Sequence, residues 1–272
     1  IYGRSVSALL GGLTVILIYL LGKELYGQRA GLLSAASLAL CMDIVGINHF
    51  AKYISLLNFS SVLTILLCVK AVRTAEDRRR RAFLLGAFLC GGFSASIQIN
   101  GPLLLLPLGL TFLFSKPSGE SKPSIHLFIP YLATYLWGLL MGTPSLLTHS
   151  TYYFHAVIDK YRLGLLTGSV DTLSPLISIL NYLFELASVF GIPLFLCVAG
   201  GGVVSAIHWK KEWKPHAVIY SFVVCYFLIM TLFFEDKFPQ TKHIIAIVPF
   251  LSLLSGRFMD HLLNQSYRLK PV

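Results

Sequence analysis

The chain has 272 residues, of which 56% are hydrophobic and only 12% are charged. This composition excludes an ordinary soluble domain, because such domains carry about 25% charged residues, and no polar stretch is long enough for a separate soluble domain. The formal net charge of +10 would suggest nucleic-acid binding in a soluble protein, but in a membrane protein it follows from basic loops held on the cytoplasmic side. We therefore expect a membrane lipid environment and no nucleic-acid partner.

Apolar runs separated by short polar loops predict an all-α, polytopic bundle of transmembrane helices. A hydrocarbon layer of about 30 Å needs roughly 20 apolar residues per helix, and only helices or closed barrels satisfy every backbone group there. About nine spans are predicted, over residues 5–22, 30–47, 56–72, 83–98, 101–115, 126–147, 187–207, 216–234 and 243–257. The runs 83–98 and 101–115 meet at Gly101-Pro102 and could instead form a re-entrant pair. We expect residues 1–272 to form a single transmembrane domain.

The distribution of Lys and Arg predicts the orientation of the bundle. With the N-terminus outside, 16 of the 22 Lys and Arg residues fall in cytoplasmic segments and 6 in outer segments. The positive-inside rule therefore predicts an outer N-terminus and a cytoplasmic C-terminus. The run from Arg78 to Arg81 is expected to determine topology and to contact lipid headgroups.

Cysteine and histidine spacing indicates neither a disulfide framework nor a metal site. The five cysteines all lie inside apolar runs, without a CxxC spacing, and are interpreted as small buried side chains. The outer histidines His149, His155 and His243 fit no metal-binding spacing.

The predicted outer face gathers cations, amides and aromatic rings that suit a phosphate-bearing headgroup and a sugar. Arg and Lys bind phosphate through charge-assisted hydrogen bonds. The candidate donor-binding residues are Asn48, His49, Lys52, Tyr53, Asn100, Arg162, Lys237, Lys242 and His243. A structural role is open for several of them, because lysines can snorkel to the interface, tyrosines can anchor a helix end, and histidines can be satisfied polar residues.

Two acidic residues fall near or inside predicted spans, where an ionised carboxylate is costly unless it is paired or close to water. Asp43 lies late in the second predicted span and Glu185 lies at the start of the seventh. We expect Asp43 at the outer end of its helix. A short interfacial helix before the seventh span would keep Glu185 in contact with water.

The order of short motifs along the chain resembles that of multi-spanning glycosyltransferases that use lipid-linked sugars. This group includes protein O-mannosyltransferases, lipid A aminoarabinose transferases and related lipopolysaccharide-core transferases. The motifs are Arg4 to Val15 with Gly11-Gly12, Gly22 to Gly27 with Ala30 to Leu33, Asn48 to Tyr53, Gly101-Pro102, Thr143-Pro144, Gly191 to Pro193 with Ala199-Gly200, and Lys242-His243 with Val248-Pro249.

The resemblance implies an integral membrane glycosyltransferase that moves a sugar from a polyprenyl-phosphate donor to an acceptor on the non-cytoplasmic face. It implies an acidic base in the first outer loop, which deprotonates the acceptor hydroxyl as that group attacks the anomeric carbon. In some members a divalent cation lies near the lipid phosphate. The short outer loops, which contain no Asn-x-Ser/Thr site, favour a bacterial inner membrane.

The chain departs from the family pattern at positions that matter for catalysis. It begins where the family's second span begins, so we expect a further span and the acidic loop to precede Ile1. Asn100 replaces the lysine of the family's Thr-Lys-Gly-Pro segment, and Ile54-Ser55 follow Tyr53 where an acidic residue is frequent. The fallback candidates for a base are Asp159, Asp171 and Glu235.

These departures keep a second class open, and the sequence does not decide whether the chain is an enzyme. The alternative is a non-catalytic glycosyltransferase-like subunit that packs against membrane-protein partners in a larger complex. A transporter is disfavoured, because the chain shows no convincing internal repeat.

Overall fold

The computed structural model describes residues 2–50, 53–98, 101–115, 125–144, 151, 155, 175–208, 213–233 and 244–268. Every element within these ranges is helical, which confirms the predicted all-α class. The elements are α1 (Tyr2–Tyr26), α2 (Gln28–Ala39), α3 (Met42–Asn48), α4 (Tyr53–Arg73), α5 (Asp77–Ile97), a 3-10 turn (Gly101–Leu104), α6 (Leu105–Phe114), α7 (Ile125–Gly142), α10 (Pro175–Phe190), α11 (Ile192–Ile207), α12 (Trp213–Phe233) and α14 (Val248–Arg268).

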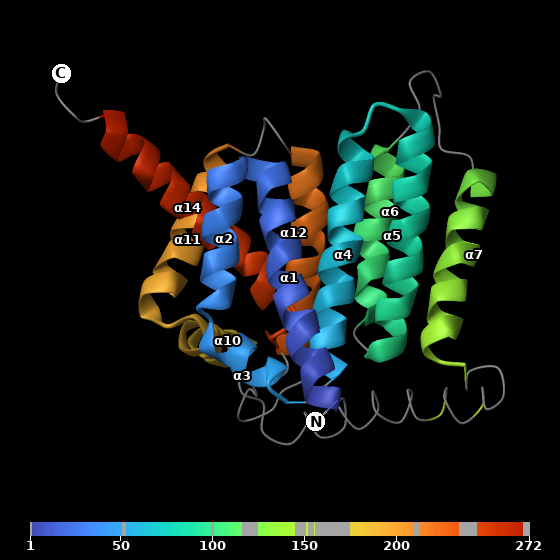
Figure 1. Ribbon diagram of the computed structural model, residues 1–272, viewed down its shortest axis with the longest axis horizontal. Helices are drawn as coiled ribbons and strands as arrows, with labels where there is room; N and C mark the ends of the chain where they lie inside the picture. Colours follow the sequence, from blue (N-terminus) through green and yellow to red (C-terminus); the bar gives the residue numbers. More distant parts are fainter. Residues whose placement is uncertain are drawn as a thin grey trace.

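Most of the long helices stand side by side in one bundle (Figure 1). Helices α3 and α10 lie across the end of the bundle at which α1 begins, and α14 runs obliquely to the others. The arginine-rich connection between α4 and α5 lies at the opposite end. The predicted topology requires the basic segments and the α3 end to lie on opposite sides of the membrane. The orientation in the membrane itself stays a prediction.

Three described helices are long and apolar enough to cross a membrane: Tyr2–Tyr26, Tyr53–Arg73 and Trp213–Thr231. The number rises to five if each of two bent helix pairs counts as one span. The structure thus supports a helical membrane protein, and the larger predicted number of spans stays a prediction.

Two of the predicted spans are interrupted by sharp bends. The predicted span 30–47 divides into α2 and α3, which are bent by 65°, and the predicted span 187–207 begins inside α10, which is bent from α11 by 117°. Gly191 permits the second bend, because its φ of 70° lies in the left-handed region that favours glycine, and α11 then begins at Ile192 with Pro193 in its first turn. Glu185 belongs to α10, a 16-residue helix that ends inside the predicted seventh span, so the expected short interfacial helix stays a prediction.

Small residues make the close contacts between helices. A Cβ at Gly31 of α2 would overlap the backbone of α1, so these two helices touch almost backbone to backbone. Hydroxyl pairs link Ser37 to Ser255 at 3.1 Å and Ser94 to Ser60 at 2.8 Å, joining α2 to α14 and α5 to α4. Such contacts are common between membrane helices, where close van der Waals packing and hydrogen bonds replace the hydrophobic effect.

Arg80, in the run of four arginines at the start of α5, is buried and has a structural role that the sequence did not indicate. Its side chain pairs with Asp77 at 2.8 Å and donates to the carbonyl oxygens of Ala75 at 2.9 Å, Thr74 at 3.2 Å and Ser115 at 3.4 Å. The guanidinium therefore closes the turn between α4 and α5 against the end of α6.

Candidate functional site

Three predicted donor-binding residues, Asn48, His49 and Tyr53, lie in the described part of the chain. The other predicted site residues lie outside the described residues, so their placement is untested. These are Lys52, Asn100, Arg162, Lys237, Lys242 and His243, with the fallback bases Asp159, Asp171 and Glu235.

A pocket of about 240 Å³ lies between α1, α2 and α3 at the end of the bundle that carries α3. Small and apolar side chains form most of its wall, and Asn48 and His49 are its polar members. A mostly apolar recess with a few polar groups can hold an apolar molecule and fix the orientation of its polar end.

Contacts with two other helices hold the Asn48 side chain of α3 in place. Its Oδ1 accepts a hydrogen bond from Ser55 Oγ of α4 at 2.7 Å. Its amide lies directly against Gly11 of α1, where a Cβ would overlap it. The pair Gly11-Gly12 is visible in the sequence, but only the fold shows which of the two glycines faces Asn48.

Tyr53 is placed differently from Asn48 and His49. It is the first residue of α4, its side chain is 54% exposed, and it does not line the pocket. The structure thus brings Asn48 and His49 together, whereas the position of Tyr53 suits the alternative of an anchor at the helix end.

The bend between α2 and α3 is connected to α10 by a buried thiol. Cys41, which precedes α3, is fully buried, and its Sγ donates to the carbonyl oxygen of Val189 at 3.1 Å. This contact holds α3 and α10 next to each other, as Figure 1 shows.

Asp43 and Glu185 are neighbours across α3 and α10. The sequence marked each carboxylate separately, and the structure brings the two half-buried side chains close enough for their charges to repel. Carboxylates on facing helices can accept hydrogen bonds from the hydroxyl groups of a ligand. Within the described ranges, no group of three or more His, Cys, Asp or Glu is placed to bind one metal ion.

The fold is similar to that of ArnT from Cupriavidus metallidurans. The TM-score is 0.62 at 17% identity for the apo structure and 0.66 at 16% identity for the structure bound to undecaprenyl phosphate. Each match covers 97% of this chain, with 46% and 47% of the ArnT chain. The Archaeoglobus fulgidus oligosaccharyltransferase, in complex with Zn and sulfate, matches with a TM-score of 0.57 at 15% identity, over 97% of this chain and 38% of that one. At these identities the likeness establishes the fold.

Two plant proteins are similar in sequence over 135 residues, which is 47% of this chain and 17% of each relative. Both are STT3B subunits of dolichyl-diphosphooligosaccharide–protein glycosyltransferase, at 30% identity in Arabidopsis thaliana and 28% in Oryza sativa subsp. japonica. The matched region is thus a small part of these relatives.

The family model for dolichyl-phosphate-mannose-protein mannosyltransferase matches residues 2–148, which is more than half of the 272 residues. The matched range includes α1, α2 and α3 and therefore the whole wall of the pocket. The resemblance to glycosyltransferases that use lipid-linked sugars is confirmed, and the chain belongs to the dolichyl-phosphate-mannose-protein mannosyltransferase family.

Proposed function

We propose that this protein transfers a sugar from a polyprenyl-phosphate donor to an acceptor on the non-cytoplasmic face of the membrane. The observation that carries the proposal is the fold shared over 97% of this chain with ArnT bound to undecaprenyl phosphate. The pocket at the α3 end adds a place where a lipid and a polar headgroup could meet.

The pocket between α1, α2 and α3 would take the part of the donor nearest its phosphate. Its volume of about 240 Å³ is small beside typical ligand pockets of roughly 300–1,000 Å³, so it suits the first isoprene units rather than a whole chain. Asn48 and His49 carry N–H groups that donate to a phosphate. The predicted cations Lys52, Arg162, Lys237 and Lys242 would add charge beside them.

The proposed step forms one bond and breaks one bond. The acceptor hydroxyl oxygen bonds to the anomeric carbon, the bond from that carbon to the phosphate oxygen breaks, and polyprenyl phosphate leaves with the electron pair. The hydroxyl proton passes to a carboxylate base. Asp43 and Glu185 are the first candidates among the described residues, because Asp43 belongs to the pocket helix α3 and Glu185 to the neighbouring helix α10. The resemblance allows a divalent cation near the lipid phosphate; within the described residues no group of three or more His, Cys, Asp or Glu is placed to hold it.

We place the α3 end on the non-cytoplasmic side because the arginine-rich connection lies at the other end of the bundle (Figure 1). A bacterial inner membrane is part of the same proposal, since the short outer loops favour it.

The second candidate function is that of a non-catalytic subunit in a larger membrane complex. The departures from the family pattern at catalytic positions favour it, and the plant relatives, which are subunits of a glycosyltransferase, support only a place in a larger complex. It predicts stable co-purification with partner proteins and no sugar transfer by the protein on its own.

Binding and transfer assays on the detergent-purified protein separate these possibilities. We expect Asn48→Ala and His49→Ala each to weaken binding of radiolabelled undecaprenyl phosphate by about three- to tenfold, the loss of one hydrogen bond to a phosphate. Met42→Ala is the matched control, because Met42 lies on the same helix, is 82% exposed and does not line the pocket. Unchanged binding in both pocket variants would refute the site.

Transfer is measured with the same variants and with Asp43→Asn and Glu185→Gln. Loss of transfer with retained donor binding would assign the base to the carboxylate pair. Donor binding without transfer by the wild-type protein, together with co-purifying partners, would instead support the subunit.

A further inference from the structure

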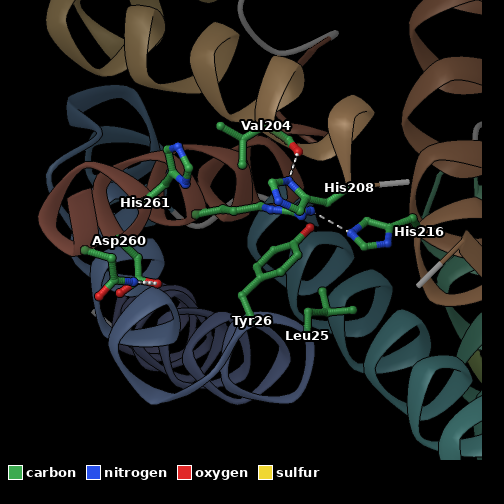
Figure 2. A pocket seen from close by; sticks show the side chains of 9 residues that line it. Leu25, Tyr26, Val204, His208, His216, Asp260 and His261 are labelled. Atoms are coloured by element: carbon green, nitrogen blue, oxygen red, sulfur yellow. Dashed lines mark hydrogen bonds between the residues drawn. The ribbon is translucent and has the colours of Figure 1, made fainter. Parts of the chain in front are cut away.

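A second pocket lies at the opposite end of the bundle, where α1 ends, and the proposed transfer does not use it. Its volume is about 260 Å³, and α1, α11, α12 and α14 all contribute to its wall. It adjoins a wider recess of about 540 Å³, with which it shares Tyr26, Asp260 and Asn264. Figure 2 shows Tyr26, His208 and His216 converging from different helices on one side of the pocket.

Arg257 of α14 supplies the positive charge of this pocket. Its Nη1 donates to Ser205 Oγ at 3.0 Å and to His216 Nε2 at 2.9 Å, and its guanidinium lies 4.6 Å from the centre of the Tyr26 ring. A guanidinium only donates, so Nε2 of the buried His216 accepts and this ring is neutral. Three neutral groups therefore orient the arginine without neutralising it.

No carboxylate in the described part of the chain forms an ion pair with Arg257. Asp260 lines the same pocket one turn along α14, but its Oδ2 accepts a hydrogen bond from Asn264 Nδ2 at 3.2 Å. A guanidinium carries five N–H donors; Arg257 uses Nη1 for Ser205 and His216 and also hydrogen-bonds the Tyr26 hydroxyl, which leaves two donors for a ligand. Charged side chains in helical membrane proteins are costly and usually have a partner of opposite charge, so an anion from outside the chain would complete this site.

Two further histidines lie on the wall beside Arg257. His208 Nδ1 donates to the carbonyl oxygen of Val204 at 2.9 Å, and the rings of His208 and His261 are 6.4 Å apart. The side-chain amide nitrogen of Gln265 donates to His261 Nε2 at 2.9 Å. A neutral His261 ring therefore carries its proton on Nδ1. That N–H is a donor additional to those of Arg257.

We propose that this pocket binds a phosphate group at the end of the bundle predicted to be cytoplasmic. Arg257 would hold two phosphate oxygens through its planar fork, and His261 would donate to a third. Leu25 and Val204 give the pocket an apolar edge, and Asp260 would accept a hydroxyl or ammonium group attached to the phosphate. The phosphate could come from a phospholipid headgroup or from a free phosphate ion, and both share this chemistry.

The test is thermal unfolding of the full protein in a neutral detergent at constant ionic strength. The probes are sodium phosphate, with sodium chloride as control, and short-chain phosphatidic acid, with the matching diacylglycerol as control. A ligand that binds only the folded state raises Tm in a saturable way, and the midpoint reports its affinity. A shift with both phosphate probes indicates a site for free phosphate, whereas a shift with phosphatidic acid alone indicates a lipid headgroup.

Four variants decide whether the pocket is the site. Arg257→Gln should weaken the effective probe about tenfold or more and His261→Ala several-fold, because each loses a donor to a charged ligand. Asp260→Asn should tighten inorganic phosphate or phosphatidic acid, since it removes a like charge, and a merely structural role would not produce this gain. Arg79→Gln removes the same charge outside the pocket and should leave the midpoint unchanged.

The proposal is overturned if neither phosphate probe shifts Tm relative to its control. It is also overturned if the midpoints of His261→Ala and Asp260→Asn equal that of the wild type. These two variants keep the test decisive if Arg257→Gln does not fold, because within the described residues both side chains form their hydrogen bonds to residues of α14. The result is independent of whether the protein transfers a sugar.

Discussion

Replacing Gly11 by alanine tests whether the packing of Asn48 builds the pocket at the α3 end. A Cβ at Gly11 would overlap the Asn48 side-chain amide and lie 3.0 Å from the Asn48 Cβ, whereas a Cβ at Gly12 would meet no atom within 4 Å. Both glycines lie on α1 and line the same pocket. Gly11→Ala and Gly12→Ala are therefore the same chemical change with opposite steric consequences.

The expected difference between the two variants follows from three contributions. Alanine stabilises a helix interior by about 1 kcal/mol relative to glycine, and at Gly12 nothing opposes this gain. At Gly11 the overlap costs about 1–3 kcal/mol, and displacing Asn48 from Ser55 costs about 1 kcal/mol more. Gly11→Ala should thus lower the free energy of unfolding by roughly 1–3 kcal/mol, and the two variants should differ by roughly 2–4 kcal/mol.

Thermal unfolding in detergent, followed by binding of radiolabelled undecaprenyl phosphate, measures both consequences. We expect Gly11→Ala to lower Tm and to weaken donor binding, while Gly12→Ala keeps or raises Tm. Equal Tm values for the two alanine variants would refute the placement of Asn48 against Gly11. A lower Tm with unchanged donor binding would show that Asn48 supports the fold without contributing to the site.

Two further pairs of variants test the packing of the bundle by thermal or denaturant unfolding. Arg80→Gln should lower the free energy of unfolding by about 2–4 kcal/mol, because it leaves buried carbonyl groups without their charged donor. Arg79→Gln should lower it by less than about 1 kcal/mol, because its ion pair with Glu76 is exposed. Equal losses would contradict the structural role of Arg80. Gly31→Ala should lower the free energy of unfolding by about 1–3 kcal/mol, because a Cβ at Gly31 overlaps the α1 backbone. Gly46→Ala on α3 should not, because a Cβ at Gly46 meets no atom within 4 Å. Destabilisation by both variants would point to an effect other than helix contact.

The sequence predicted features that depend on local chemistry and missed those that depend on distant contacts. The cost of a carboxylate in a membrane span singled out Glu185, and the structure places it on α10, which is separated from α11 by a sharp bend. The break between α2 and α3 was not predicted, because the apolar run is continuous and the bond from Cys41 to Val189 joins residues 148 positions apart. Likewise Arg79 and Arg80 are identical in type, and the fold, including the position of the end of α6, makes only Arg80 buried.

The same reasoning explains why the candidate site was predicted only in part. Asn48 and His49 were identified as polar residues at an outer end, and the pocket contains both. Asp43 and Glu185 each stood out from their apolar surroundings, but their meeting requires both sharp bends in the chain, one before α3 and one after α10.

The two bends therefore create the polar end of the bundle at which the candidate transfer site lies. Helices that cross a membrane side by side bury small residues and hydroxyl pairs between them, because a polar group at mid-depth is costly. This cost does not apply to a helix that lies across the end of the bundle, because its polar side chains can face the aqueous interface while its apolar side chains pack on the helices below. Helices α3 and α10 lie across the end of the bundle (Figure 1), and within the described residues they carry Asp43, Asn48 and Glu185 of the candidate transfer site, with His49 capping α3. The opposite pocket is built instead from the ends of α1, α11 and α12 and from α14, so each end of the bundle gathers polar groups in its own way and the two sites can be tested separately.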